Sequence, residues 1–202
     1  MKDNDKNMVS TEEITADEKQ TAKKRTPVEF VFHLLKDYFY LYGGPLIAII
    51  LGLVIFQFGI VPTGSMEPNY HAGSFYVAFR LIDTDDIARG TPVVFKREDG
   101  IMYFKRVIGL PGDTISFEDG NVYINGEELD ESVYLEPDVP TSAGYRDEYV
   151  IPDGCYFMLG DNRQYSLDAR YWDNPFISSD AISGRVLFTV KLPFWNAIST
   201  NA

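Results

Sequence analysis

The sequence predicts a mostly β fold in which a single N-terminal transmembrane helix is followed by an extracytoplasmic β-rich domain. Three observations support this. Charged residues are absent from Tyr38 to Met66. Short apolar stretches separated by turn signals follow that segment. After it, the sequence shows no long pattern typical of an amphipathic helix.

The uncharged segment is long enough to cross a membrane. Leu41 to Val61 is 21 residues, or about 31 Å of helix, and a bilayer's hydrocarbon core is about 30 Å thick. A helix buried in a soluble domain rarely stays uncharged over this length. A cleaved signal peptide would begin nearer the first residue and carry a shorter apolar stretch. We therefore expect an uncleaved membrane anchor.

Basic residues around the anchor predict its orientation. Residues 23–25 and Lys36 precede the apolar segment, whereas the first basic residue after it is Arg80. The positive-inside rule therefore places the N-terminus in the cytoplasm and everything after Val61 outside the cell membrane.

The charge pattern divides the chain into three parts. Residues 1–26 hold six basic and six acidic residues, which predicts a disordered cytoplasmic tail. Residues 27–61 form the expected juxtamembrane and transmembrane helix. Residues 62–202 form the expected extracytoplasmic β-rich domain, with 11 basic and 22 acidic residues and a small insertion around 118–153.

Alternating and apolar runs in this domain predict strands. Turn signals such as Asp99-Gly100, Asp119-Gly120 and Asn125-Gly126 separate them. The expected strands are 75–79, 92–97, 101–109, 121–124, 155–159 and 184–191.

Composition excludes several classes of protein. A single Cys forms neither an intrachain disulfide nor a Cys-rich zinc site. A net charge of −12, without a long basic run, argues against nucleic-acid binding. The sequence suggests neither a metal nor a cofactor.

Ser65 is the first candidate for chemistry. It stands in PTGSMEP (Pro62–Pro68), directly after the apolar segment. A Ser in a Pro/Gly turn is usually structural, but Gly64 also permits close approach of a ligand to the backbone.

Lys105 is the second candidate, because it interrupts an apolar strand pattern in YFKRVIGLPGD (Tyr103–Asp113). Such a Lys commonly reaches solvent at a strand edge. Alternatively it is buried and acts as a base. That requires burial to lower its pKa from about 10.4 to about 7–8, which corresponds to roughly 4 kcal/mol. Arg106 cannot serve, since a guanidinium keeps its proton.

The third candidate is GDNRQYSLDAR (Gly160–Arg170). This polar run either forms an exposed turn or braces a reacting group, with Asp168 and Arg170 supporting Ser166. The residues alone leave both interpretations open.

Histidines are scarce. His33 precedes the anchor and is expected in the cytoplasm, and His71 follows Ser65 by six residues. A Ser–Lys dyad is therefore favoured over a Ser–His pair.

Taken together, the anchor, SMEP, PVVFKR, KRVIGLPGD and GDNRQYSLDAR resemble the type I bacterial signal peptidases in order and spacing. The resemblance spans about residues 45–190. It implies that Ser65 is the nucleophile and Lys105 the general base. It also implies an oxyanion hole formed by the Ser65 backbone N–H and the Thr63 hydroxyl. The same resemblance gives Ser166, Asp168 and Arg170 supporting roles.

Three positions depart from the family pattern. Asn69-Tyr70 replaces Thr-Leu, Ala169 replaces Ser, and Gly90-Thr91 replaces Gly-Asp. None of the three removes a group of the expected dyad.

The resemblance implies a membrane-anchored serine endopeptidase that removes signal peptides from secreted preproteins at the outer face of the bacterial cytoplasmic membrane. It implies substrates with small residues before the cleavage site, contact with the lipid bilayer, no cofactor or nucleic acid, and a monomeric enzyme. Shallow apolar pockets are expected. We place Ile60, Phe75, Val77, Val94 and Tyr103 in their walls. Two alternatives are an anchored β domain that binds exported peptides or cell-wall material, and a self-cleaving Ser–Lys regulator.

Overall fold

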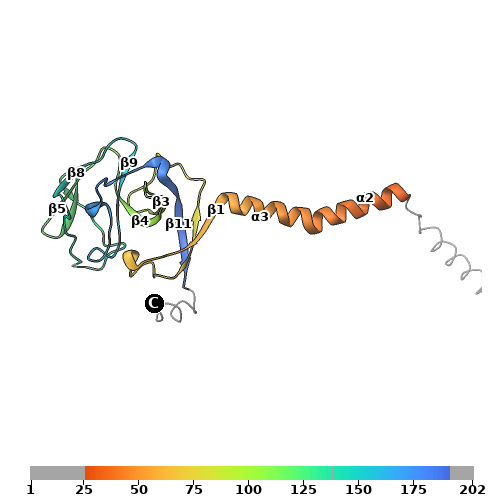
Figure 1. The fold of residues 1–202 in the computed structure, drawn as a ribbon, viewed down its shortest axis with the longest axis horizontal. Helices are drawn as coiled ribbons and strands as arrows, with labels where there is room; N and C mark the ends of the chain where they lie inside the picture. Colours follow the sequence, from red (N-terminus) through yellow and green to blue (C-terminus); the bar gives the residue numbers. More distant parts are fainter. Residues whose placement is uncertain (1–25, 138, 192–202) are drawn as a thin grey trace, which may run out of the picture. The chain divides into compact units, whose positions relative to one another are not determined.

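The computed structural model describes residues 26–137 and 139–191 (Figure 1). The expected cytoplasmic tail therefore lies outside the described residues, except for Thr26. The chain divides into two units, residues 1–51 and 52–202.

One helix runs from Pro27 to Ile55. It consists of α2 (Pro27–Tyr38), a π-helical turn η1 (Phe39–Gly43) and α3 (Gly44–Ile55). At its start, the Thr26 hydroxyl accepts from the Glu29 N–H, and the Glu29 carboxylate accepts from the Thr26 N–H. This capping box satisfies two backbone donors that a helix end otherwise leaves free.

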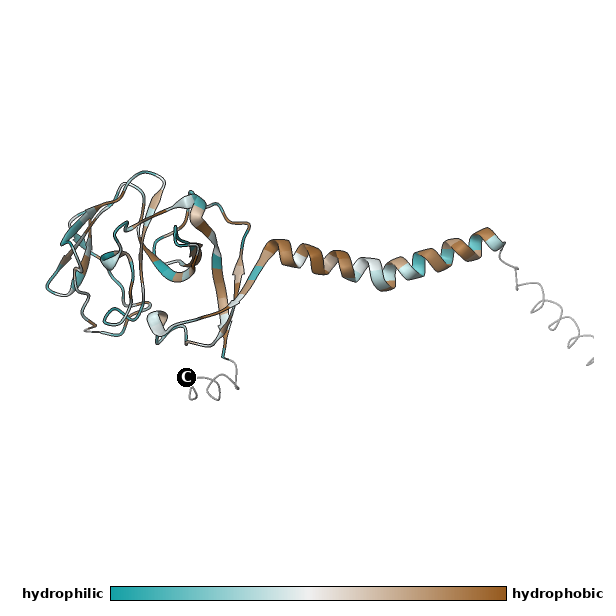
Figure 2. Cartoon of the chain, viewed as in Figure 1, coloured by the Kyte–Doolittle hydropathy of each residue, from teal (hydrophilic) through white to brown (hydrophobic). Residues whose placement is uncertain are grey.

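The helix is apolar enough to cross a membrane. Its most apolar 18-residue stretch has a mean hydropathy of 2.0, and Figure 2 shows α3 as almost entirely hydrophobic. The N-terminal helix predicted from hydropathy is therefore present.

The helix ends at Ile55, before the expected boundary at Val61. Phe56–Ile60 instead form strand β1, which pairs antiparallel with β2 (Phe75–Phe79). Gly59 leaves room for the Tyr76 ring of β2, because a Cβ there would lie 2.5 Å from that ring. Strand pairing therefore takes over where the aromatic residues and a glycine replace the Leu- and Ile-rich helix.

After the helix, the described residues up to Lys191 form mostly β structure in two sheets. The larger sheet has the strand order β1-β2-β11-β3-β4-β9-β10, and the smaller has the order β7-β6-β5-β8. The remaining strands are β3 (Pro92–Lys96), β4 (Met102–Gly109), β5 (Thr114–Glu118), β6 (Asn121–Ile124), β7 (Glu127–Glu128), β8 (Glu148–Val150), β9 (Cys155–Leu159), β10 (Phe176–Ser178) and β11 (Ile182–Val190). Three short 3₁₀ helices are η2 (Gly64–Met66), η3 (Ala169–Tyr171) and η4 (Ser179–Ala181).

Two of the three predicted turn signals occur in the smaller sheet, and the third, Asp99-Gly100, lies between β3 and β4 of the larger sheet. Asp119-Gly120 joins β5 to β6, and Asn125-Gly126 joins β6 to β7. All four residues have positive φ, as a two-residue type I′ turn requires.

Two hydrophobic clusters pack the domain and position the loops. The larger contains residues of both sheets, such as Ile115 and Phe157. The smaller surrounds Val61 and Met66 and includes Phe104 of β4. Because Val61 and Met66 are both buried, the turn between them is fixed against the larger sheet.

Candidate active site

A cavity of about 480 Å³ lies beside β4. The turn before and around Ser65 forms one wall, and the start of β4, including Lys105, forms another. Its lining residues are Val61 to Ser65, Ile101 to Lys105, Asn162, Tyr165 and Leu167. The structure therefore brings Thr63, Ser65 and Lys105 to one site.

Ser65 lies in the single turn of η2. The neighbouring Met66 is completely buried in the smaller hydrophobic cluster, whereas Ser65 is only half-buried. The Thr63 hydroxyl lies 3.2 Å from Ser65 Oγ, slightly longer than a usual O–H···O hydrogen bond. A buried anchor thus holds a serine side chain at the cavity wall.

The loop that follows β9 holds this turn from the other side. Asn162 donates its backbone N–H to the Ser65 carbonyl at 3.1 Å and its side-chain amide to the Gly64 carbonyl at 3.0 Å. Sequence reasoning did not single out Asn162, although it lies in the polar run 160–170.

Gly160 permits the close approach of this loop. A Cβ at that position would lie 2.4 Å from the Ser65 carbonyl oxygen and 2.1 Å from Ser166 Oγ. Only glycine fits without displacing the backbone of the Ser65 turn.

Lys105 is almost fully buried, with 3% of its surface exposed. It lies in β4 opposite Val93, and strand alternation places it on the same face as Tyr103 and Val107. Burial lowers the pKa of Lys105 to about 8, and the nearby charge of Asp168 only partly opposes this. The ammonium is therefore destabilised, as a general base requires.

Asp168 and Arg170 form a fully buried ion pair, in which Arg170 Nε and Nη2 donate to the carboxylate at 2.8 and 2.9 Å. The Asp168 carboxylate also accepts from the Gly160 N–H at 3.0 Å. The pair thereby holds the loop that contacts the Ser65 turn. The buried interpretation of the 160–170 run fits this geometry better than an exposed ion pair.

Ser166 is also buried, and among the described residues its Oγ has no hydrogen-bond partner. A buried hydroxyl normally has one. It contacts the site through its close packing with Gly160.

A second buried ion pair links β4 to the same loop. Arg106 Nε and Nη2 donate to Asp161 at 2.8 and 2.5 Å, and Arg106 Nη1 donates to the Gly90 carbonyl at 2.7 Å. The sequence reasoning gave Asp161 no role. Its position in the polar run 160–170, between Gly160 and Asn162, was the signal that could have identified it.

The departures from the family pattern are accommodated. Ala169 is completely buried in the larger hydrophobic cluster, and the Asp168–Arg170 pair is intact beside it. Tyr70 packs on Phe104 with ring centroids 4.9 Å apart. Asn69 donates to Asp161 at 2.8 Å.

His71 makes a contact away from the serine. Its Nδ1 lies 2.6 Å from Glu67 Oε2, and it is not among the residues that line the cavity. His33 lies in α2.

The expected pocket walls need a correction. Tyr103 lines the cavity, but Ile60, Phe75, Val77 and Val94 do not. Val94 packs in the smaller hydrophobic cluster. Phe75, Val77 and Ile60 belong to the paired strands β1 and β2. Within the described part of the chain, no group of three or more metal-ligating side chains could hold a metal ion.

Comparison with known proteins shows the family. The family model "Signal peptidase, peptidase S26" matches residues 36–192. Signal peptidase I of Bacillus caldolyticus is 37% identical over 153 residues, covering 68% of this chain and 81% of that protein. Signal peptidase I T of Bacillus subtilis is 32% identical over 199 residues, covering 91% of this chain and 96% of that protein.

A longer relative matches in part. Signal peptidase I of Pseudomonas fluorescens is 32% identical over 162 residues, covering 60% of this chain and 57% of that protein. The match thus spans little more than half of that relative's length. A crystal structure of a signal peptidase I from Enterococcus faecalis aligns with a TM-score of 0.40 and 29% identity, covering 50% of this chain and 97% of that one.

This chain belongs to the S26 signal peptidase family, since the family model matches most of its length.

Proposed function

We propose that this protein is a membrane-anchored serine endopeptidase that removes signal peptides from secreted preproteins. Ser65 is the nucleophile and Lys105 the general base. Family membership supports the reaction class, and the cavity supports the two residues.

One observation carries the assignment of residues. A serine hydroxyl and a buried lysine whose pKa is lowered to about 8 line the same cavity. About one Lys105 side chain in ten is then neutral at pH 7, against about one in 2,500 for a free lysine. An amine that can act as a base and a serine hydroxyl therefore line one cavity, and the described histidines do not line it.

The reaction follows from these positions. Neutral Lys105 takes the proton of Ser65 as Oγ attacks the scissile carbonyl, and the resulting ammonium later protonates the leaving amine. The Ser65 N–H and the Thr63 hydroxyl stabilise the oxyanion, each donor contributing about 3–4 kcal/mol. Water, deprotonated by Lys105, then hydrolyses the acyl-enzyme.

The surrounding polar residues hold the base and the turn. Ser166 has a hydroxyl free to donate to neutral Lys105, which favours the uncharged amine. Asp168 and Arg170 keep the loop that carries Ser166 in place.

The cavity suits an extended peptide with small side chains. Residues 102–104 of β4 pair with β3 on one edge, whereas β9 begins to pair with β4 only at Arg106. The other edge of 102–104 is therefore open for pairing with a substrate strand. Apolar walls at Ile101 and Leu167 favour apolar residues before the cleavage site, and the family resemblance suggests that these residues are small.

The anchor concentrates the enzyme where its substrates lie. The apolar helix and the basic residues before it support an N-terminus in the cytoplasm and a cavity on the outer side of the bacterial cytoplasmic membrane. The protein contacts lipid through this helix and acts as a monomer. Anchoring enzyme and preprotein in one membrane raises their effective concentration.

Incubation of the detergent-solubilised full chain with a labelled preprotein tests the proposal. Wild-type protein is expected to release the shortened product, and Ser65→Ala and Lys105→Ala are each expected to abolish release. Lys96→Ala is the matched control, because Lys96 is an exposed lysine on neighbouring β3. Binding without cleavage by the wild type, or robust cleavage by Lys105→Ala, would refute the dyad.

A further inference from the structure

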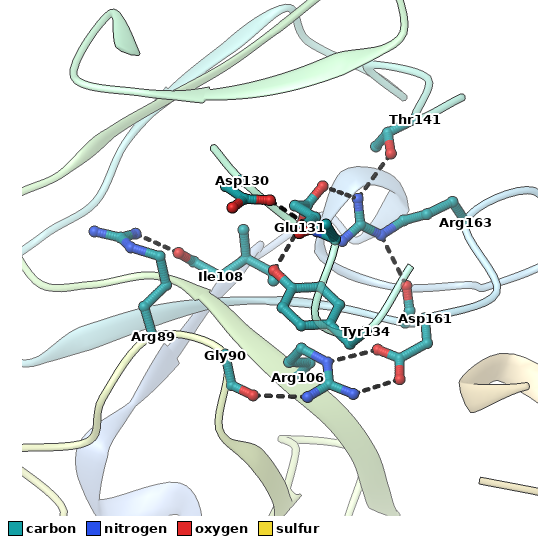
Figure 3. Close-up of polar contacts among 12 residues, drawn as sticks. Arg89, Gly90, Arg106, Ile108, Asp130, Glu131, Tyr134, Thr141, Asp161 and Arg163 are labelled. Carbon is teal, nitrogen blue, oxygen red and sulfur yellow. Dashed lines mark hydrogen bonds and ion pairs between the residues drawn. The ribbon is translucent and has the colours of Figure 1, made fainter. Parts of the chain in front are cut away.

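A polar network beside the cavity takes no part in the proposed chemistry. It is drawn in Figure 3, which shows Tyr134 between two arginine–carboxylate pairs. One pair is Arg106–Asp161, and the other is Arg163–Glu131. Glu131 and Tyr134 come from the segment 129–137, which follows β7 of the smaller sheet. The network therefore joins the smaller sheet to the catalytic loops.

Tyr134 contacts both pairs. Its ring lies 4.2 Å from the Arg106 guanidinium, and its hydroxyl donates to Glu131 Oε1 at 2.8 Å. Burial, together with the charge of Glu131, raises the pKa of Tyr134. The hydroxyl therefore keeps its proton and donates throughout the working pH range.

Arg163 links Glu131 to the 160–162 loop, which contacts the Ser65 turn. Its Nη1 and Nη2 donate to Glu131 at 2.7 and 2.5 Å, and its Nε donates to the Gly160 carbonyl at 3.0 Å. Arg163 is almost completely buried, so losing its carboxylate partner would leave a buried charge uncompensated. Glu131 thereby fixes the residue that holds Gly160.

Asn69 connects the same network to the nucleophile's own segment. It lies four residues after Ser65. Its side-chain amide nitrogen lies 2.6 Å from the Tyr134 carbonyl and 2.8 Å from Asp161 Oδ2.

This inference rests on the proposed function. We propose that three residues position the 160–162 loop against the Ser65 turn. They are Asn69, Glu131 and Tyr134, and together we call them the Tyr134 clamp. These three are positioning residues, since none lines the cavity. They act through Gly160 and Asn162, which contact the backbone of the turn. The smaller sheet thus supports the geometry of the nucleophile and its oxyanion donors.

The clamp makes a specific kinetic prediction. The cavity walls at Ile101 and at residues 102–104 of β4 lie outside the clamp, so we expect substrate binding to be retained. Tyr134→Leu removes the ring and the hydroxyl, and kcat is expected to fall about tenfold while KM stays within about twofold, because small misplacements of reacting groups cost rate. Tyr134→Phe keeps the ring over Arg106, and kcat is expected to fall about threefold.

The experiment measures the melting temperature of the full chain in detergent, and then kcat and KM at a temperature well below it. Tyr145→Leu is the matched control, because this tyrosine is 70% exposed and its ring packs only on Tyr171 among the described aromatic residues. The double variant Asn69→Ala/Tyr134→Leu is expected to lose much less kcat than the product of the two single losses, since both variants act on the rate through the same 160–162 loop.

The results separate the clamp from the proposed function. If the wild type cleaves and Tyr134→Leu matches Tyr145→Leu in kcat, or the two single losses multiply, the clamp is overturned and the function stands. If Tyr134→Leu does not fold, an unchanged kcat in Tyr134→Phe overturns the clamp, and a lowered kcat at unchanged KM supports it. A wild type that cleaves no preprotein overturns the function and the clamp together.

Discussion

Two adjacent cations on β4 have opposite environments. Arg106 is paired with Asp161 and donates to the Gly90 carbonyl, whereas Lys105 forms no ion pair within the described part of the chain. Both are buried. A buried cation with a carboxylate partner stays charged and holds loops together, and one without a partner is driven towards its neutral form. One strand thereby carries a cation held in an ion pair and, at the preceding position, the lysine that we propose as the base.

The largest expected effect on stability comes from removing the paired cation. Arg106→Met leaves Asp161 buried without its partner and is expected to lower the free energy of unfolding by about 3–5 kcal/mol. Chemical denaturation at pH 7 measures this. An unchanged denaturation midpoint would show that the Arg106–Asp161 pair does not stabilise the fold, which would contradict the contrast drawn between Arg106 and Lys105.

Removing the unpaired cation, Lys105, is expected to raise the free energy of unfolding. Lys105→Met relieves the desolvation that lowers the lysine pKa from 10.5 to about 8, and should stabilise the fold at pH 7 by about 3 kcal/mol. The same variant should lose cleavage by at least about a thousandfold. Denaturation and turnover of one preparation test both, and a destabilised Lys105→Met would contradict the account.

The pH dependence of stability sharpens the contrast. Because the pKa of Lys105 is lower in the folded chain, the unfolded chain binds more protons between about pH 8 and 10.5. Wild-type stability should therefore rise with pH across this window relative to Lys105→Met. Denaturation of both proteins at pH 7 and pH 9 measures the difference, which should narrow at the higher pH. A constant difference would mean that Lys105 titrates normally.

The smallest expected effect is at His71. It pairs with Glu67 at a half-exposed site, and such pairs contribute less than about 1 kcal/mol. His71→Ala should leave both turnover and stability almost unchanged in the preprotein assay. Complete loss of cleavage would instead support a Ser–His mechanism.

Three predicted strands have their predicted bounds, whereas β5, which ends at the Asp119-Gly120 turn signal, was not predicted. β2, β6 and β9 begin and end at the predicted residues. β1 was missed because its residues continue the apolar run of the anchor, and apolarity alone does not separate helix from strand. β8 and β10 are three residues long, too short for a periodic signal.

In the candidate site, too, some residues had a signal in the sequence and others had none. Ser65 and Lys105 stand in motifs whose local chemistry is unusual, so the sequence singled them out, and both line one cavity. Tyr134 had no such signal. Two of its contacts, with Arg106 and Asn69, join positions at least 28 residues apart along the chain, and no local pattern predicts a contact of that kind.

The pH dependence of kcat/KM tests the central claim most directly, because it reports ionisation in the free enzyme. With Lys105 as the base, kcat/KM for preprotein cleavage should fall about tenfold per pH unit below a midpoint near pH 8. Lys96→Ala should leave that midpoint unchanged. A profile that is flat from pH 9 down to pH 6, or a midpoint near the ordinary lysine value, would contradict the account.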